Sequence, residues 1–472
     1  MRKQTFRPKG KRGQILIMAT LMIVPLFGVL GLVTDIGYMH YVKMTAQSAA
    51  EAGAKAAIIN FLQTQGGGSV TCPNTNPNIV CASTPAPCST SITTPANSIQ
   101  NGCLYAQAHG FNSAGAVTYQ TGASTTPPTA PGIGTPSYWV TFRAARQVPM
   151  LFSAILGNFN GTVVARSTAA IIGSPDCIYA LKPTGTAISV GGTNSALTSS
   201  CGVFDNSSDN CDISTSGGGT VRAPSYNLVG NVTGCSQAPN LTGSSPVTGV
   251  PPGTDPLSYL PAPVTCTSSA PCQCDFRNIN LPNQSVVDLY PGTYCGGINV
   301  GNQTVNFHNN ADGSPGIYNL VGGGLSTQSA NSHINGTDVM FFNTYGDVYS
   351  HGSHFTETYS PISINANSTV DLSAPTAGTY AGILFYDDRT APEASDSYGG
   401  GSTAIYQGTI YTPTADITMY GNSTASTNPS QNSQYTLIIA YTISLQGTTG
   451  LSNNYSTLPN NASPIQQVGV VE

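Results

Sequence analysis

The sequence predicts a mainly β chain that begins with one long helix, and three observations carry this prediction. A basic segment is followed by an uncharged, mostly aliphatic run of twenty residues, Ile15 to Thr34. An alanine-rich stretch with helical periodicity then continues to about Leu62. From Cys177 to the end, short apolar pairs alternate with polar residues between turns rich in glycine and asparagine, which is typical of short strands. We therefore expect a membrane helix, a helical stalk, a small α/β module and a parallel β-solenoid.

The composition indicates a chain whose bulk lies outside the cytoplasm. Only 7% of its 472 residues are charged, whereas an ordinary soluble protein carries roughly 25%. The surface of a typical cytosolic enzyme is therefore excluded. The 12 cysteines are an even set, which suits an oxidising compartment.

The N-terminal charges and the apolar run together predict a single-pass membrane helix. Residues 1–12 hold six of the 15 basic side chains. Twenty helical residues at 1.5 Å each cover a hydrocarbon core of about 30 Å, and the preceding positive charges place the N-terminus in the cytoplasm. A cleaved signal peptide, the alternative, would have a shorter apolar core and a small-x-small site directly after it. Nucleic-acid binding is not expected, because membrane topology explains the basic cluster.

The helix is expected to span residues 13–65 and to end at the glycines 66–68. One of its faces carries small side chains, which let another helix or a sheet approach closely. This docking face packs either on partner subunits or on the chain's own domain, and the sequence leaves both open. Its residues are Ala46, Ala49, Ala50, Gly53 and Ala57.

Two further regions follow. Residues 66–176 should form a disulfide-pinned loop and a small α/β module. Residues 177–472 should form the solenoid, because Pro-Gly-x-Tyr recurs 24 residues apart at 291–294 and 315–318, and repeats of 20 to 30 residues indicate stacked coils. The same spacing separates two cysteine pairs, which would then lie one coil apart at disulfide distance. The predicted bridges are Cys177 to Cys201 and Cys211 to Cys235.

The sequence offers only weak candidates for chemistry. Asp387 and Asp388, followed by Arg389, could supply an acid and a base on a solenoid flank. A solvated, self-neutralising turn is the favoured interpretation of this trio. The sequence from Asp212 to Ser216 has the form of an Asp-x-Ser-x-Ser metal motif, but the buried strand that such a motif needs does not precede it. No catalytic residue, metal or cofactor is therefore expected.

Several stretches carry a resemblance to a known family. Gly13-Gln14, the apolar run, Asp35 and the alanine-rich segment 46–54 resemble the N-terminal segment of the TadE/TadG-like Flp pilus-assembly (Tad, tight adherence) proteins. Residues 138–170 are similar to the strand, amphipathic helix and strand that follow in that family. The region from Cys177 onward is similar to the extracytoplasmic domain of large TadG-related proteins.

The resemblance implies a fold, a location and partners. It implies a pilin-like character for the α/β module and a right-handed parallel β-helix for residues 177–472. It also implies a bacterial inner-membrane protein whose bulk is periplasmic or extracellular and whose partners are pilus-assembly or pilin-like proteins. Pilin-like members carry a glutamate five residues after the cleaved glycine, where this chain has Met18. We therefore expect a non-enzymatic assembly or adhesion component rather than a major pilin. A carbohydrate-binding or polysaccharide-cleaving β-helix, which would contact surface glycans, is the alternative.

Overall fold

The computed structural model describes residues 12–65, 70–128, 135–150, 159–193, 195–279, 281, 285–400, 404–420, 434–458, 461 and 463–471. The chain is mainly β with one long N-terminal helix. It divides into two compact units. The first comprises residues 1–65, 70–171 and 468–472, and the second residues 66–69 and 172–467. The expected boundaries at 65 and 176 therefore do not separate the helix from the module that follows it.

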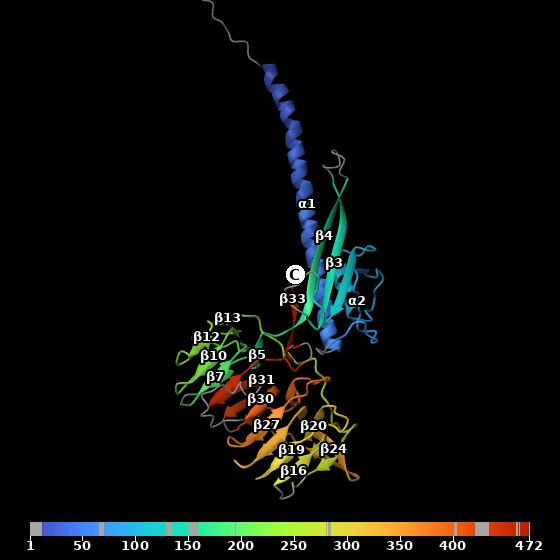
Figure 1. Cartoon of the computed structure of the whole chain (residues 1–472). Helices are drawn as coiled ribbons and strands as arrows, with labels where there is room; N and C mark the ends of the chain where they lie inside the picture. The colour runs from blue at the N-terminus through green and yellow to red at the C-terminus, as the bar shows by residue number, and fades with distance from the viewer. Residues whose placement is uncertain are drawn as a thin grey trace, which may run out of the picture. The chain divides into compact units, whose positions relative to one another are not determined.

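The first unit is built on helix α1 (Arg12–Gln65), which ends where the sequence predicts. Its C-terminal half packs against α2 (Ser98–Ala108) and β3 (Tyr138–Pro149). The packing is close because small residues meet there. A Cβ atom on Gly53 would lie 3.0 Å from a ring carbon of Phe142 and 3.1 Å from the carbonyl oxygen of Gly102. Figure 1 shows the N-terminal part of α1 extending past the ends of β3 and β4.

The sheet of this unit has the order β1-β2-β3-β4-β33, and its pairs from β1 to β4 are antiparallel. The final strand β33 therefore returns to the first unit, although the sequence assigns every residue after 177 to the solenoid. The helix implied between the two long strands is not seen at its beginning, since β3 continues to Pro149; residues 151–158 lie outside the described residues. The other strands are β1 (Ala86–Pro87), β2 (Val117–Ala123), β4 (Asn160–Gly173) and β33 (Gln466–Val470).

Disulfides pin the polar loop of the first unit, as the sequence predicts. Cys72 is bonded to Cys81, and Cys88 is bonded to Cys103 of α2. The second bridge ties the loop to the helix that packs on α1, so the loop has a fixed attachment despite its lack of long strands.

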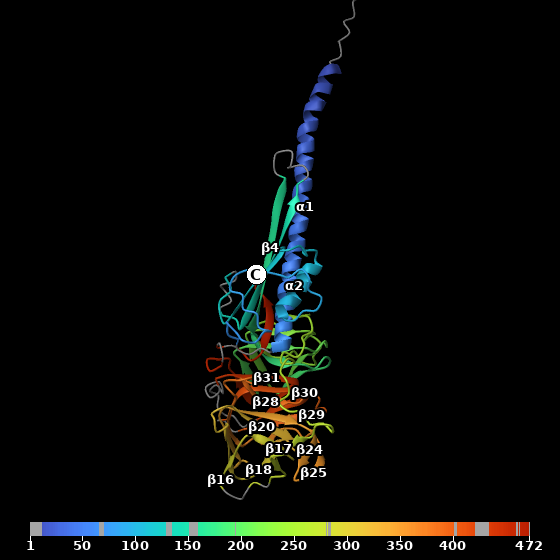
Figure 2. The ribbon, with the colours of Figure 1, turned by 90° about the vertical axis from the view of Figure 1, so that its right-hand side faces the viewer.

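The second unit contains a 21-stranded sheet whose described strand pairs are parallel. Its strands stack at regular steps along the chain. Val203 pairs with Ile178, 25 residues earlier, and with Tyr226, 23 residues later. Both steps lie within the range expected for one coil. Figure 2 shows β17, β20, β28 and β31 following one another along the stack.

Aromatic side chains stack from rung to rung in the interior of this unit. Tyr318, Phe341 and Phe385 occupy paired positions in β20, β23 and β28, and all are buried. Their ring centroids lie 5.4 and 5.3 Å apart in the stacked arrangement. Large rings at the same position of successive parallel strands give the core its packing and hold the register.

The order of strands along the stack does not follow the chain. The late strand β31 (Thr436–Gln446) pairs with the early strand β5 (Asp176–Ala180) through Ile438 and Ile178. The strands from β15 to β31 therefore precede those from β5 to β13 along the stack. The segment that joins β13 to β15, residues 249–275, must return along the length of the stack.

Arg389 anchors this return segment. Its guanidinium Nε lies 3.4 Å from Asp255 Oδ2, and its Nη1 donates to the carbonyl oxygen of Leu260 at 2.8 Å. The hydroxyls of Tyr411 and Tyr386 donate to Asp255 Oδ2 at 2.5 Å and to Leu260 O at 3.1 Å. The Arg-Asp pair is thus structural and draws one partner from outside the trio seen in the sequence.

The four disulfides of this unit include both predicted bridges. Cys177 pairs with Cys201 at a Cα–Cα distance of 5.7 Å, and Cys211 pairs with Cys235 at 4.7 Å. The remaining bridges join Cys266 to Cys272 and Cys274 to Cys295, near the end of the return segment.

The strands of the second unit are short, and three small groups differ from the main stack. Strands β7, β10, β12 and β32 form a separate parallel sheet, and β14 joins the antiparallel hairpin β24-β25. The bounds are β6 (Ile188–Val190), β7 (Ala196–Ser199), β8 (Gly202–Asp205), β9 (Ile213–Thr215), β10 (Thr220–Ala223), β11 (Tyr226–Leu228), β12 (Leu241–Gly243), β13 (Val247–Thr248), β14 (Cys272–Gln273), β15 (Phe276–Arg277), β16 (Val286–Leu289), β17 (Gly292–Cys295), β18 (Ile298–Val300), β19 (Thr304–Phe307), β20 (Gly316–Val321), β21 (Leu325–Thr327), β22 (His333–Gly336), β23 (Val339–Thr344), β24 (Gly346–Ser350), β25 (Ser353–Glu357), β26 (Ser363–Ile364), β27 (Thr369–Ser373), β28 (Ile383–Asp387), β29 (Ala394–Tyr398), β30 (Ile405–Tyr420) and β32 (Thr448–Leu451).

The close contact at Gly53 predicts a steric effect on the first unit alone. Gly53→Leu should lower the free energy of unfolding of this unit by at least about 1 kcal/mol, since the new side chain meets Phe142 and the backbone of Gly102. Trp139, the single tryptophan of the chain, is buried in β3, so its fluorescence reports this transition. Lys55→Leu, at an exposed position of the same helix, is the control. Equal destabilisation by both changes would contradict the packing described.

Candidate functional site

The exposed apolar surface of α1 is the first candidate site. From Met18 to Ile36 its described apolar side chains are exposed on all sides of the helix. Within the described residues, the structure has one helix long and apolar enough to cross a membrane, Leu21–Gln65, near the N-terminus. A helix that is apolar all round fits a lipid environment. The exposed side chains are Met18, Leu21, Met22, Ile23, Leu26, Val29, Leu30, Leu32, Val33 and Ile36.

The small-residue face of the same helix is already occupied. Each of its five members is buried, and Gly53 contacts α2 and β3 of its own unit. The structure thus selects one of the two alternatives that the sequence left open. Docking of partner subunits on Ala46, Ala49, Ala50, Gly53 and Ala57 is wrong, because these residues form the core of the first unit.

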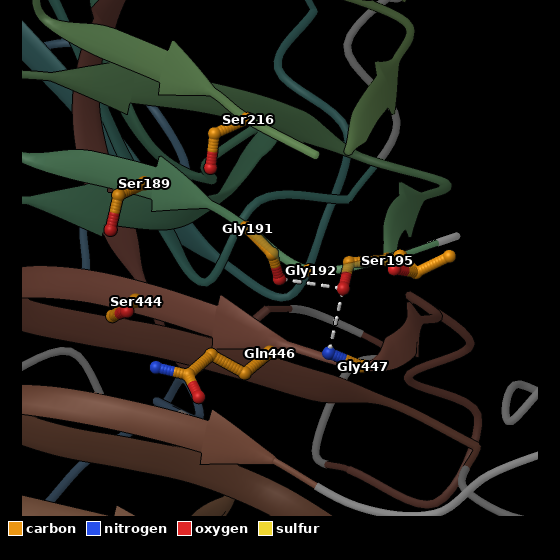
Figure 3. Close-up of a pocket in the computed structure, with 9 residues that line it drawn as sticks. Ser189, Gly191, Gly192, Ser195, Ser216, Ser444, Gln446 and Gly447 are labelled. Atoms are coloured by element: carbon orange, nitrogen blue, oxygen red, sulfur yellow. Dashed lines mark hydrogen bonds between the residues drawn. The ribbon is translucent and has the colours of Figure 1, made fainter. Parts of the chain in front are cut away.

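A polar cavity of about 520 Å³ opens on the second unit and is the second candidate site. Ser444 of β31, Ser189 of β6 and Ser214 of β9 are paired in register across three neighbouring strands. Two of these, Ser189 and Ser444, line the cavity together with residues of the adjoining loops. Figure 3 shows them with Gly191, Gly192, Ser195, Ser216, Gln446 and Gly447.

The cavity can bind polar groups but has no means of activating a nucleophile. Its described lining residues are serine, threonine, glycine and glutamine, so they include no acid or base. The hydroxyl of Ser195 is committed to structure, since it donates to Gly191 O at 2.6 Å and accepts from Gly447 N at 3.1 Å (Figure 3). Hydroxyl and amide groups of this kind suit a neutral polar ligand.

The structure does not present Asp387 and Asp388 as a pair. Asp387 ends strand β28 and is completely buried. Asp388 closes a turn, where its Oδ1 accepts from the amide of Thr390 at 2.8 Å and its Oδ2 from the hydroxyl of Thr344 at 2.6 Å. His351 lies at the tip of the β24-β25 hairpin, with φ of 50°. The solvated turn proposed from the sequence therefore describes Asp388, whereas Asp387 belongs to the interior.

Asp387 has a buried carboxyl partner that the sequence did not suggest. Asp396 of β29 lies beside it and is also completely buried. Tyr359 donates its hydroxyl to Asp387 Oδ2 at 2.8 Å, and Asp396 Oδ1 accepts the amide of Ile362 at 2.8 Å. Burial first, and then the neighbouring Asp396 carboxylate, raise the pKa of Asp387 well above its ordinary value; burial also raises the pKa of Asp396. One proton shared by the two carboxyl groups accounts for this arrangement.

The groups around this pair supply no positive charge. Tyr359, Tyr398 and Asn343 face it, and burial raises the pKa of both tyrosines as well. The residue missed in the sequence, Asp396, lies nine positions after Asp387 on the next short strand. Nothing in that spacing distinguishes it from a surface aspartate, because both follow apolar-polar alternation.

The pair predicts that stability falls as pH rises. Because the folded pKa of Asp387 is raised above the unfolded value of about 3.9, the native state holds more protons than the unfolded state between these two pKa values. Stability is therefore complete below pH of about 4 and decreases as pH rises through the folded pKa. Asp387→Asn, which needs no proton, should weaken this dependence.

Denaturant titrations between pH 5 and 8, followed by the near-ultraviolet circular dichroism of the buried tyrosines, measure the effect. Glu393→Gln removes an exposed carboxylate of the same unit and should leave the wild-type slope unchanged. A wild-type stability that rises steadily over this range would disprove the shared proton.

Comparison with known proteins gives one match. Residues 13–59 match the model of the Flp pilus-assembly TadE/G-like family, a segment that begins one residue after α1 starts and covers both its exposed and its buried parts. No curated protein and no solved structure matches the chain. Over residues 13–59 the chain is therefore similar to the Flp pilus-assembly TadE/G-like family, the same family that its N-terminal residues resemble.

Proposed function

We propose that this protein is a non-enzymatic component of Tad/Flp-type pilus assembly or adhesion, anchored in the bacterial inner membrane by the N-terminal part of α1. The single observation that carries the proposal is the family match over residues 13–59. The N-terminus lies in the cytoplasm, and the two units lie on the periplasmic or extracellular side. Six disulfides support this placement, since such bonds persist in oxidising compartments.

The exposed helix surface supports the anchor. The side chains from Met18 to Ile36 have no protein to cover them, and leaving this much apolar surface in water is unfavourable. The segment is about 30 Å long at 1.5 Å per residue, which is the thickness of a hydrocarbon core. Single-pass insertion removes this surface from water without disturbing the buried half of the helix.

The parallel register supports a right-handed β-helix for the second unit. Each coil returns to the strand position of the previous one after 20 to 30 residues, and the interior rings stack between coils. Such a unit presents long lateral faces made of short strands. We assign it the role of a display element, which offers these faces to other components of the pilus apparatus.

Contacts with pilin-like partners then fall on the exposed side of α1 just beyond the membrane. Tyr38, Tyr41 and Met44 are 47%, 66% and 61% exposed and follow one another at helical spacing. Val42 and Ala46 on the other side are buried in the first unit. These three side chains replace the small-residue face as the docking surface for a partner helix.

This assignment predicts a loss of partners without a loss of folding. Tyr41→Ala/Met44→Ala should abolish the recovery of pilus-assembly proteins with the full chain purified in mild detergent, as identified by mass spectrometry. Trp139 fluorescence should melt at the wild-type temperature, because neither side chain contributes to the core. The variant should also remain in the membrane fraction.

The matched control is Ile59→Ala, a change at an exposed position of the same helix that lies beyond the docking surface. It should recover the same partners as wild type. Recovery of these proteins with the double variant would show that docking occurs elsewhere, and a soluble wild-type protein after alkaline extraction would remove the anchor.

A second function, glycan binding, is favoured by a surface on strands β16, β19 and β22. Tyr290 is 58% exposed and stacks on His308 with ring centroids 5.0 Å apart. Beside them Asp288 Oδ1 lies 2.9 Å from His308 Nε2 and accepts from Asn306 Nδ2 at 3.0 Å. The hydrogen bonds from His308 and Asn306 lower the pKa of Asp288, so its carboxylate stays ionised. An aromatic face next to ordered carboxylate and amide groups suits a sugar ring and its hydroxyls.

If this surface binds glycans, Tyr290→Ala should weaken binding to a responsive oligosaccharide at least tenfold, about 1.4 kcal/mol. Glycan arrays followed by calorimetry on the full chain measure the change. Tyr349→Ala, at an exposed tyrosine of the β24-β25 hairpin, should bind like wild type. Equal affinity of the two variants would exclude this surface.

A further inference from the structure

Two buried carboxylates lie at a corner of the second unit where three successive coils pass. Asp205 ends strand β8, and Asp212 immediately precedes β9. Both residues are completely buried, as is Ser207 in the loop between them. The loop itself reaches the surface at 208–210. The pair takes no part in the surfaces described above.

Three of the four carboxylate oxygens have no hydrogen-bond partner. Asp205 Oδ1 accepts the amide of Ser207 at 3.0 Å, but Asp205 Oδ2 and both oxygens of Asp212 accept nothing. The donors nearest to Asp212 are directed elsewhere. Ser207 Oγ donates to Gly185 O at 2.6 Å, and Gly230 N donates to Ser207 O at 2.7 Å. Buried carboxylates without donors are costly, and structures rarely retain them without a compensating charge.

No basic side chain in the described part of the chain supplies that charge. The groups that act on Asp205 and Asp212 electrostatically are acidic, namely Asp212 on Asp205 and Asp209 on Asp212. Burial is the main cause that raises the pKa of Asp205 to about 8 and that of Asp212 to about 6. The site is therefore negative and closed near neutral pH, with oxygen atoms directed inward.

We propose that Asp205 and Asp212 hold a calcium ion. The available donors are oxygens, from two carboxylates, the hydroxyl of Ser207 and the carbonyl groups of the loop, and calcium accepts such mixed, irregular sets. Magnesium retains several waters, for which a completely buried pair leaves no room. Among the described residues no three His, Cys, Asp or Glu side chains converge on one point, which argues against a transition metal.

The surrounding backbone closes tightly over this position. A Cβ atom on Gly230 would lie 2.7 Å from Asp212 Oδ1 and 2.1 Å from Asp209 O, so only glycine fits there. Gly185, Ser207 and Gly230 come from three successive coils and are joined to one another by hydrogen bonds. Calcium at the carboxylates ties these coils together at their corner. The site differs from the Asp-x-Ser-x-Ser pattern, since Ser216 lines the open cavity whereas Asp212 does not.

Calorimetric titration of the full chain with CaCl₂ tests the proposal, after treatment with EDTA and in mild detergent. One calcium ion should bind per chain, and melting of the second unit, followed by near-ultraviolet circular dichroism, should shift upward with calcium. Asp212→Asn and Asp205→Asn should each weaken binding at least tenfold. Glu393→Gln should bind like wild type, and MgCl₂ should bind at least tenfold more weakly than CaCl₂.

The wild-type titration decides the matter even if the variants fold poorly. Absence of binding and of any melting shift up to about 10 mM calcium, well above the range of extracellular calcium sites, would overturn the proposal. A higher melting temperature of Asp212→Asn than of wild type at pH 8 without calcium, together with no calcium effect on wild type, would show that a proton neutralises the pair instead. Undiminished calcium binding by both Asn variants would place the ion elsewhere and equally overturn it.

Discussion

The parallel pairing of β31 with β5 is the constraint on which the second unit depends. It joins the end of one series of coils to the beginning of another, so the strands form a single stack although the chain enters it in the middle. The return segment follows from this order, and Arg389 exists to hold it. A guanidinium can bind a carboxylate and several carbonyl oxygens at once, which a lysine cannot do with the same geometry. The one Asp-Asp-Arg trio in the sequence is thus divided among interior, turn and anchor.

The features that local sequence could predict are those with a short period. The extent of α1 follows from its apolar and alanine-rich pattern, and the bridges Cys177–Cys201 and Cys211–Cys235 follow from a coil of about 24 residues. The strand order could not be predicted, since any parallel strand with alternating apolar residues can pair with another. Nor could the position of Asp387, because one shift along a strand exchanges its inward and outward faces.

Helix α1 has two chemically distinct halves with separate tasks. Its N-terminal half is apolar and exposed, whereas its C-terminal half uses small residues to bring α2 and β3 into close contact. The family match covers both halves, so the similarity belongs to the helix as a unit and not only to a membrane segment. Buried polar groups in the second unit are similarly concentrated, in the pairs Asp387–Asp396 and Asp205–Asp212, each at the end of a short strand. A solenoid places successive strand ends at the same corner, which explains why carboxylates distant in sequence meet there.

The permuted strand order also has a consequence for biosynthesis. The ribosome makes β5, β8 and β11 first, but the strand that covers the free edge of β5 is made about 250 residues later. During that interval the early coils carry an open parallel edge, which is a template for association with other chains. The bridges within these coils join cysteines that are both already synthesised, so oxidation can hold the early coils together while the edge waits. Completion of the stack therefore coincides with completion of the chain, and a nascent protein interrupted before residue 436 exposes an adhesive surface that the finished protein conceals.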